Sequence, residues 1–266
     1  MLPSAILQYP DTDLTMNIDK IYEDDDLVIV NKPSGLLVIP DRFNAQLPSL
    51  NKMLETKTGQ KAWVVHRLDR ETSGVVCFAK NEETHRYLSI LFQERGVDKY
   101  YAGLVDGIVM PDEGRIEGPI AEHPAIPGKM TVARKGKEAI TDYKVAEQWP
   151  LYALMQFRIY TGRTHQIRVH MQSIGHPLVC DELYGEGEPF LLSRIKRKYN
   201  MSGKDEVEKP LLSRMALHAY RIVFEDRHGK LITAECELPR DISACVKQLN
   251  KWSKPLTAQE PEMGEE

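Results

Sequence analysis

The chain has 266 residues, 42% hydrophobic and 28% charged, with a formal net charge of −4, which is the composition of a globular protein of one large or two small domains. No apolar run approaches the roughly 20 residues that a membrane-spanning helix needs, and residues 1–10 lack the basic and apolar segments of a signal peptide. The four cysteines lie far apart without a Cys-x-x-Cys pair, so we expect reduced thiols in a cytoplasmic protein rather than disulfides or a zinc site.

Alternating apolar and polar residues dominate the pattern along the chain and predict a protein rich in strands. An acidic turn at 23–26 separates the first two strands and favours a hairpin, and residues 32–35 then break the chain. We expect strands at 20–22, 27–31, 36–39, 62–65, 74–79, 100–105, 139–147, 152–160, 216–224 and 231–237.

Helical spacing of apolar residues predicts a smaller number of helices. Asn81 is placed to cap one helix and Gly96 to stop it, while Thr164 and Gly175 take the same positions around another. The helix after Asn81 has one buried stripe, formed by Tyr87, Leu88, Leu91 and Phe92. We expect helices at 49–57, 81–95, 164–174 and 190–199, with residues 242–252 closing the fold.

Strands and helices mix without a regular alternation, so the natural fold class is α+β with a largely antiparallel sheet. We expect one domain over residues 18–252, preceded by a tail at 1–17 and followed by a disordered acidic tail at 253–266. An insertion at about 186–212 contains a polar stretch, 200–208, that we expect to be mobile.

A polar loop, His-Arg-Leu-Asp-Arg-Glu-Thr-Ser-Gly at 66–74, lies between two apolar strands. Asp69 sits between Arg67 and Arg70, so we expect it to keep a low pKa and to stay ionised at neutral pH, available as a nucleophile or an electrostatic stabiliser. Taken alone, however, the loop fits better with Asp69 capping a turn and both arginines in solvent.

A second polar cluster, Thr-Gly-Arg-Thr-His-Gln-Ile-Arg-Val-His at 161–170, follows a strand and opens a helix. Backbone N–H groups at a helix start, together with Arg163 and His165, make a site for phosphate. His165 and Arg168 lie on one helical face at i and i+3, so Arg168 can approach a carboxylate of another element, such as Asp69. A basic helix start in solvent explains the same residues equally well.

Aromatic and basic residues elsewhere fit an RNA partner. Tyr100 and Tyr101 begin a strand and point to opposite faces, so one packs in the core and the other can stack on a base. The first 26 residues carry a charge of −6 and the last ten −4, which leaves +6 on the body of the chain. Basic runs within 129–144 and 194–198 are candidate phosphate contacts, and a solvated surface explains both runs as well.

Together these segments resemble the RluA-type RNA pseudouridine synthases. The resemblance runs in order from about Ile18 to Cys245 and implies the pseudouridine-synthase fold, a bent, mostly antiparallel mixed sheet flanked by helices and loops around a central cleft. It rests on the two polar clusters and on four further segments: Val-Asn-Lys-Pro-Ser-Gly at 30–35, Ala-Lys at 79–80, Lys-x-Tyr at 99–101 and Gly-His-Pro-Leu-Val-Cys-Asp at 175–181.

The resemblance implies a role for each matching position. Asp69 matches the essential catalytic aspartate, Tyr101 the tyrosine that stacks on the uracil, and Arg168 the arginine that pairs with the aspartate. Tyr100 is the alternative to Tyr101. Arg67 matches the arginine that enters the space left by the flipped nucleotide. The expected RNA-binding set is His66, Arg67, Arg70, Thr72, Arg163, His165, Gln166, Lys196, Arg197 and Lys198.

The implied activity is isomerisation of specific uridines to pseudouridine in structured RNA, either large-subunit ribosomal RNA or transfer RNA. We expect no metal and no cofactor, since His165 and His170 are five residues apart and off a common helical face. We expect a cytoplasmic monomer without a membrane partner. We also expect the family's extra N-terminal RNA-binding module to be absent, because about 17 residues precede the first strand.

Two rival functions remain compatible with these residues. A catalytically silent RNA-binding protein of the same fold would have no need of the Asp69 carboxylate between two arginines. A glycosidase or nuclease that uses Asp69 with a second carboxylate is the other, and detection of abasic sites or cleaved RNA would support it.

Overall fold

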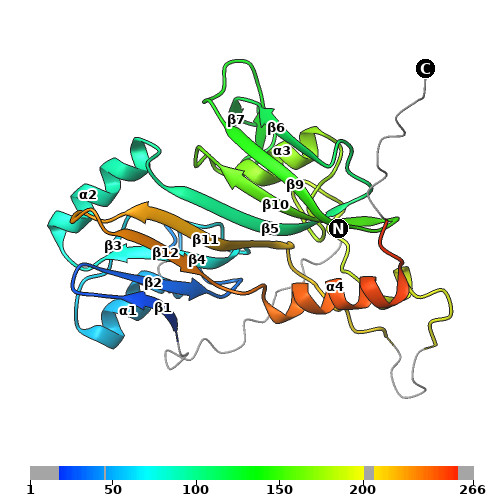
Figure 1. Cartoon of the computed structure of the whole chain (residues 1–266), viewed down its shortest axis with the longest axis horizontal. Helices are drawn as coiled ribbons and strands as arrows, with labels where there is room; N and C mark the ends of the chain where they lie inside the picture. Colours follow the sequence, from blue (N-terminus) through cyan, green and yellow to red (C-terminus); the bar gives the residue numbers. More distant parts are fainter. Residues whose placement is uncertain (1–17, 45, 201–206, 257–266) are drawn as a thin grey trace, which may run out of the picture.

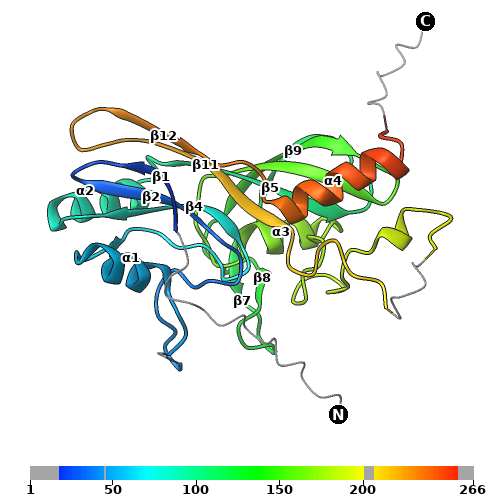
Figure 2. The same ribbon diagram turned by 90° about the horizontal axis from the view of Figure 1, so that it is seen from below.

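A computed structural model describes residues 18–44, 46–200 and 207–256 of the chain (Figures 1 and 2). The predicted tail at 1–17, residues 201–206 of the predicted insertion and residues 257–266 lie outside this range. The described residues form one ten-stranded mixed sheet, a separate two-stranded sheet and four α-helices. The predicted α+β class with a largely antiparallel sheet is confirmed.

One half of the large sheet comes from the N-terminal part of the chain. Its strands are β1 (Asp19–Glu23), β2 (Leu27–Lys32), β3 (Trp63–Val64) and β4 (Ser73–Ala79). β1 and β2 form the predicted hairpin, and β2 and β3 pair antiparallel with β4. Helix α1 (Leu50–Thr58) packs on one face of β2 and β4, and α2 (Glu82–Gln93) packs on the other. Because both faces are covered, these two strands are buried at almost every position.

The other half of the sheet is built around β5 and β10, which pair antiparallel over their full lengths. Its strands are β5 (Asp98–Asp106), β6 (Glu113–Glu117), β9 (Ile140–Gln148), β10 (Tyr152–Ile159), β11 (Leu217–Glu225) and β12 (Leu231–Glu235). Helix α3 (Gln166–Ser173) packs on one face and α4 (Arg240–Trp252) on the other (Figure 2). The small sheet of β7 (Ile120–Glu122) and β8 (Met130–Val132) lies next to α3.

The two halves meet where β4 pairs with β11, which is the parallel pairing of the sheet. Only two residue pairs make this junction, and Ala219 lies opposite Gly74. Gly74 has φ +117°, and a Cβ added to it would lie 2.0 Å from the carbonyl oxygen of Ala219. The glycine that ends the first polar cluster is therefore required so that the two backbones can approach each other.

Gly74→Ala is expected to lower the free energy of unfolding by roughly 2–5 kcal/mol, because left-handed strain adds to overpacking against the β11 backbone. Gly59→Ala is the matched control, since Gly59 also has positive φ but has no atom within 4 Å of an added Cβ, so only the strain of about 1–2 kcal/mol applies. Urea unfolding of both variants measures the difference. Equal losses in the two variants would mean that the β4–β11 contact does not constrain position 74.

Several predicted elements differ from the structure at their ends. Asn81 caps α2 as predicted, since its side chain accepts a hydrogen bond from the backbone N–H of Thr84 at 2.9 Å. The helix ends at Gln93, and Arg95 rather than Gly96 takes the left-handed conformation. Likewise α3 begins at Gln166 and not at Thr164, because His165 has φ +56°.

Two predicted elements are wrong because long-range contacts prevail over the local pattern. In place of a helix at 190–199, only Leu192–Arg194 form a short 3-10 helix, η1, because Phe190 pairs its backbone with Leu212. In place of a strand at 36–39, the carbonyl groups of Leu37 and Val38 accept the first N–H groups of α1. This contact satisfies donors that would otherwise lack a partner at that helix end.

Candidate active site

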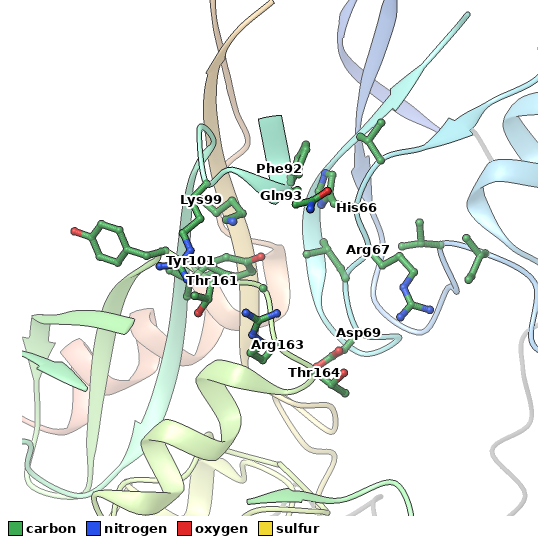
Figure 3. Close-up of a pocket in the computed structure, with 18 of the residues that line it drawn as sticks. His66, Arg67, Asp69, Phe92, Gln93, Lys99, Tyr101, Thr161, Arg163 and Thr164 are labelled. Carbon is green, nitrogen blue, oxygen red and sulfur yellow. The ribbon is translucent and has the colours of Figure 1, made fainter. Parts of the chain in front are cut away.

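A cleft of about 620 Å³ opens where the polar loop before β4 faces β5 and the segment after β10 (Figure 3). A smaller pocket of about 80 Å³ continues it toward the start of α3. Both share Arg67, Asp69, Tyr101 and Arg163 in their walls. Residues of both polar clusters, far apart in the chain, are thus brought to one place.

The loop that carries Asp69 is held by the segment Lys32-Pro33-Ser34-Gly35. The Lys32 ammonium is fully buried and donates hydrogen bonds to the carbonyl oxygens of Leu36 and Arg70 at 2.8 and 2.9 Å, and to that of Pro33. The backbone N–H of Gly35 also donates to Arg70, and the Ser34 hydroxyl donates to the carbonyl of Glu71 at 2.6 Å. Burial lowers the pKa of Lys32 to about 7, with Glu71 and Asp69 opposing the shift.

Asp69 faces Arg168 across the cleft floor. An Asp69 carboxylate oxygen lies 3.6 Å from Nη1 of Arg168, which is an ion-pair distance longer than a direct hydrogen bond. The Asp69 side chain is 30% exposed, and no described residue donates a hydrogen bond to its carboxylate. The carboxylate is thus close to a cation but keeps its lone pairs available.

Arg168 is fixed by a second carboxylate that the sequence analysis did not single out. Asp181 is fully buried and accepts hydrogen bonds from Nε and Nη2 of Arg168 at 2.7 and 2.8 Å. Asp181 also accepts from the N–H groups of Leu183 and Tyr184. Burial by itself lowers the pKa of Arg168, but the hydrogen bonds that Arg168 donates to Asp181 and the attraction of both carboxylates raise it overall. Asp181 ends the segment 175–181, so its sequence signal was present but carried no assigned role.

Tyr101 is the tyrosine that faces the cleft, and Tyr100 is not. The Tyr101 ring is buried among β5, β10 and β11 and lines both parts of the cleft. Burial, with a smaller effect of Asp69, raises the pKa of its hydroxyl above the usual value. Tyr100 lies on the opposite face of β5, against Tyr220 and near the guanidinium groups of two arginines. The geometry thus favours Tyr101 as the cleft residue.

His165 connects the cleft to the small β7–β8 sheet. The Tyr184 hydroxyl accepts a hydrogen bond from the backbone N–H of Met130 and lies 2.8 Å from Nδ1 of His165. The Tyr184 hydroxyl therefore links the His165 ring to the backbone of β8. Burial lowers the pKa of His165, with Asp69 opposing, so the neutral form is favoured.

Other residues of the expected RNA-binding set serve the protein itself. The Gln166 amide is buried and has four partners, Thr161, Ile140, Thr141 and the N–H of Arg163. His66 stacks on Phe92, with ring centroids 4.7 Å apart, and its Nε2 accepts the N–H of Cys77. Burial lowers the pKa of His66 to about 3, so it is neutral at physiological pH.

Arg67 and Arg163 lie at the cleft with freer guanidinium groups. Arg67 is exposed, and Figure 3 shows its guanidinium directed away from Tyr101. Arg163 donates from Nε to the carbonyl of Glu138 at 2.9 Å. Arg70 points elsewhere and donates to Gly35, while Thr72 is buried beside the smaller pocket.

The basic run at 196–198 is not part of the cleft. It follows η1, and the Lys196 ammonium lies 4.6 Å from the ring of Trp252 at the end of α4. Arg197 and Lys198 are exposed. The structure therefore separates this run from the two polar clusters.

Within the described part of the chain, no group of three or more His, Cys, Asp or Glu side chains is arranged to hold a metal ion. Over the same residues, no helix combines the length and apolarity that crossing a bilayer requires.

Comparison with known proteins agrees with this geometry. A family model described as RNA pseudouridylate synthase matches residues 26–173. An uncharacterized RNA pseudouridine synthase of Aquifex aeolicus is 44% identical, over 63% of this chain and 56% of its own length. The ribosomal large subunit pseudouridine synthase D of Neisseria meningitidis is 39% identical, over 85% of this chain and 60% of its own length. The chain thus spans less than two thirds of these two relatives.

Among solved structures, the human RNA pseudouridylate synthase domain containing 4 superposes with a TM-score of 0.68 and 25% sequence identity. The match covers 87% of this chain and 93% of that one. The two chains thus share their overall fold over most of their lengths.

Proposed function

The chain belongs to the RNA pseudouridylate synthase family, and we propose that it isomerises uridines in structured RNA to pseudouridine. One observation carries the proposal: the Asp69 carboxylate lies 3.6 Å from the Arg168 guanidinium, yet accepts no hydrogen bond from the described residues. A binding module has no use for an anion kept in this state. An enzyme that must stabilise or trap a cationic ribose does.

The first step is exposure of the target base. A uracil inside an RNA helix or tight loop cannot reach Asp69, so it must be flipped out at a cost of a few kcal/mol. Arg67 and Arg163 stand at the entrance with cationic groups for the backbone. Arg67 is the residue we propose to fill the gap that the base leaves.

The second step is cleavage of the bond between the base and the ribose. This cleavage develops positive charge on the sugar, which the Asp69 carboxylate stabilises or captures. We propose that the Arg168 guanidinium orients this carboxylate through their ion pair, while the hydrogen bonds to Asp181 hold Arg168 in place.

The third step is rotation of the freed uracil and bond formation through carbon 5. The proton lost from carbon 5 is balanced by the proton gained at nitrogen 1, so the reaction is a net isomerisation without an oxidant or reductant. We propose that the Tyr101 ring stacks on the uracil during rotation, since it forms the buried side of the cleft next to Asp69.

We propose ribosomal RNA of the large subunit as the first substrate to test, ahead of transfer RNA. The support is the name of the Neisseria meningitidis relative, which specifies the ribosomal large subunit.

The four cysteines are all free thiols, three of them buried. Free thiols agree with the cytoplasmic location that we propose for this chain. We also propose that the chain is a monomer.

Release of tritium from RNA labelled at carbon 5 of uridine tests the activity directly, because that hydrogen leaves during isomerisation. We expect the purified chain to release tritium from a large-subunit ribosomal RNA transcript. Stoichiometric RNA binding without release would instead favour the catalytically silent protein.

The basic run is neutralised in a variant that combines Lys196→Met, Arg197→Met and Lys198→Met. We expect this variant to bind RNA more weakly. The slope of log affinity against log salt concentration should become shallower by about 0.7–0.9 for each phosphate that is no longer neutralised. Because Lys196 is already engaged by Trp252, we expect no more than two such phosphates. The control is Lys52→Met with Lys230→Met, which removes lysines on other surfaces. A slope that stays at the wild-type value would exclude this run from the RNA interface.

A further inference from the structure

Lys99 is a buried cation in the cleft to which the mechanism above assigns no task. It is 8% exposed and lies on β5 two residues before Tyr101, so both side chains point to the same face of the strand. Figure 3 shows both directed into the space opposite His66 and Asp69. The Lys-x-Tyr spacing thus places an ammonium beside the proposed stacking ring.

The Lys99 ammonium has no anionic partner of its own. Among the described residues, no acceptor hydrogen-bonds to it, and the acid that acts on it most, Asp98, is bound by Arg158 at 2.6 Å. Its other neighbours are the Phe92 ring, whose centroid lies 5.8 Å away, and the cationic Arg95. Burying a cation without a partner is costly, so such a site needs a reason.

We propose that Lys99 contacts the substrate, donating a hydrogen bond to a carbonyl oxygen of the flipped uracil; this inference rests on the function proposed above. An ammonium can only donate, and uracil offers carbonyl oxygens at positions 2 and 4, whereas cytosine carries an amino group at position 4. A contact at position 4 would therefore also reject cytosine.

Depth in the cleft favours the base over the phosphate as the ligand. Arg67 is exposed at the entrance, where the RNA backbone must pass, whereas Lys99 is buried on strand β5. A flipped base extends inward from the backbone to such a position. Lys99 is also on the same strand face as Tyr101, so the ring that stacks on the base and the donor that reads its edge come from one rigid element.

Lys99→Met is expected to lower kcat/KM by about 10- to 100-fold, as for the removal of a charge-assisted hydrogen bond. The RNA dissociation constant is expected to stay within about threefold, with an unchanged salt slope, because every phosphate keeps its cation. Lys52→Met, an exposed lysine on α1 paired with Glu55, is the matched control and should have wild-type kinetics. Thermal unfolding verifies that Lys99→Met is folded.

The base contact itself is tested with RNA that carries 4-thiouridine or 2-thiouridine at the target position, since sulfur is the weaker acceptor. In the wild type, one of the two substitutions should reduce the rate. In Lys99→Met that reduction should disappear, because the donor is gone, and the position that shows this identifies the contacted oxygen.

The comparison of the pH profiles of the wild type and Lys99→Arg supplies a further readout that is specific to Lys99. Burial, opposed by Asp98 and aided by Arg95, lowers the pKa of Lys99 to about 8, and nearby His66 is neutral. The ammonium is thus mostly charged at pH 7 and mostly neutral at pH 9. The wild-type rate should fall several-fold from pH 7 to pH 9, and Lys99→Arg should lose most of this fall because arginine stays charged.

The outcomes distinguish a failure of the proposed function from a failure of the proposed role of Lys99. If the wild-type chain has no activity on any RNA, the proposed function fails. If the wild type is active and Lys99→Met is within threefold of it, the Lys99 inference fails alone. A flatter salt slope in Lys99→Met, with undiminished sensitivity to both thiouridines, would overturn it in favour of a phosphate contact.

Discussion

Asp69→Asn is expected to lower the rate of pseudouridine formation by about 1,000-fold or more while leaving RNA affinity within about tenfold. The substitution keeps the shape of the side chain and removes the charge that we propose to face the ribose. The phosphate contacts that we propose for Arg67 and Arg163 involve other side chains of the cleft and should persist. Single-turnover kinetics with saturating enzyme measure the chemical step, and filter binding measures affinity.

Asp25→Asn is the matched control for this variant, since Asp25 is exposed in the turn between β1 and β2. It should behave as the wild type in both assays. Substantial turnover by Asp69→Asn, within about tenfold of the wild type, would remove Asp69 from the chemistry and with it the mechanism proposed above.

Arg168→Met is expected to lose activity by about 100-fold or more and to lower the free energy of unfolding by roughly 3–5 kcal/mol. The two losses have different causes. The loss of stability comes from Asp181, whose fully buried carboxylate would lose its cation. The loss of activity comes from Asp69, which would lose its neighbouring charge. Urea unfolding and single-turnover kinetics measure the two effects separately.

The double variant Arg168→Met with Asp181→Asn separates stability from catalysis. The asparagine leaves a side-chain oxygen for the N–H groups of Leu183 and Tyr184 and removes the unpaired charge, so most of the stability should return. Activity should remain low. Recovery of both together would mean that Arg168 matters only for folding, and normal turnover in Arg168→Met would refute its proposed role at Asp69.

Most of the fold was predictable because strand periodicity and helix caps are local signals. The hairpin of β1 and β2 follows from the acidic turn, and the start of α2 follows from Asn81. The strands that were missed, β6 to β8, bury few side chains and have no apolar run. The helix at 190–199 was predicted from its local pattern, and that prediction is wrong because Phe190 pairs with Leu212, a residue distant in sequence.

The sequence predicted several residues that line the candidate site but not which of their side chains contact one another. The two polar clusters identified Asp69 and Arg168, yet the sequence alone left their separation open and offered Arg168 a single partner. Asp181 lay within the matching segment 175–181 but was given no role, because only the folded chain shows that it accepts hydrogen bonds from Arg168. The choice of Tyr101 over Tyr100 needed the register of β5 against β10, which only the folded sheet provides.

Mapping of pseudouridine in total RNA from a strain without this chain, against its parent, tests the central claim most directly. We expect discrete pseudouridines of the parent to be absent from the strain and to be restored by the wild-type chain but not by Asp69→Asn. An unchanged map would contradict the proposed function. Full restoration by Asp69→Asn would leave the activity standing and contradict the role of the carboxylate beside Arg168.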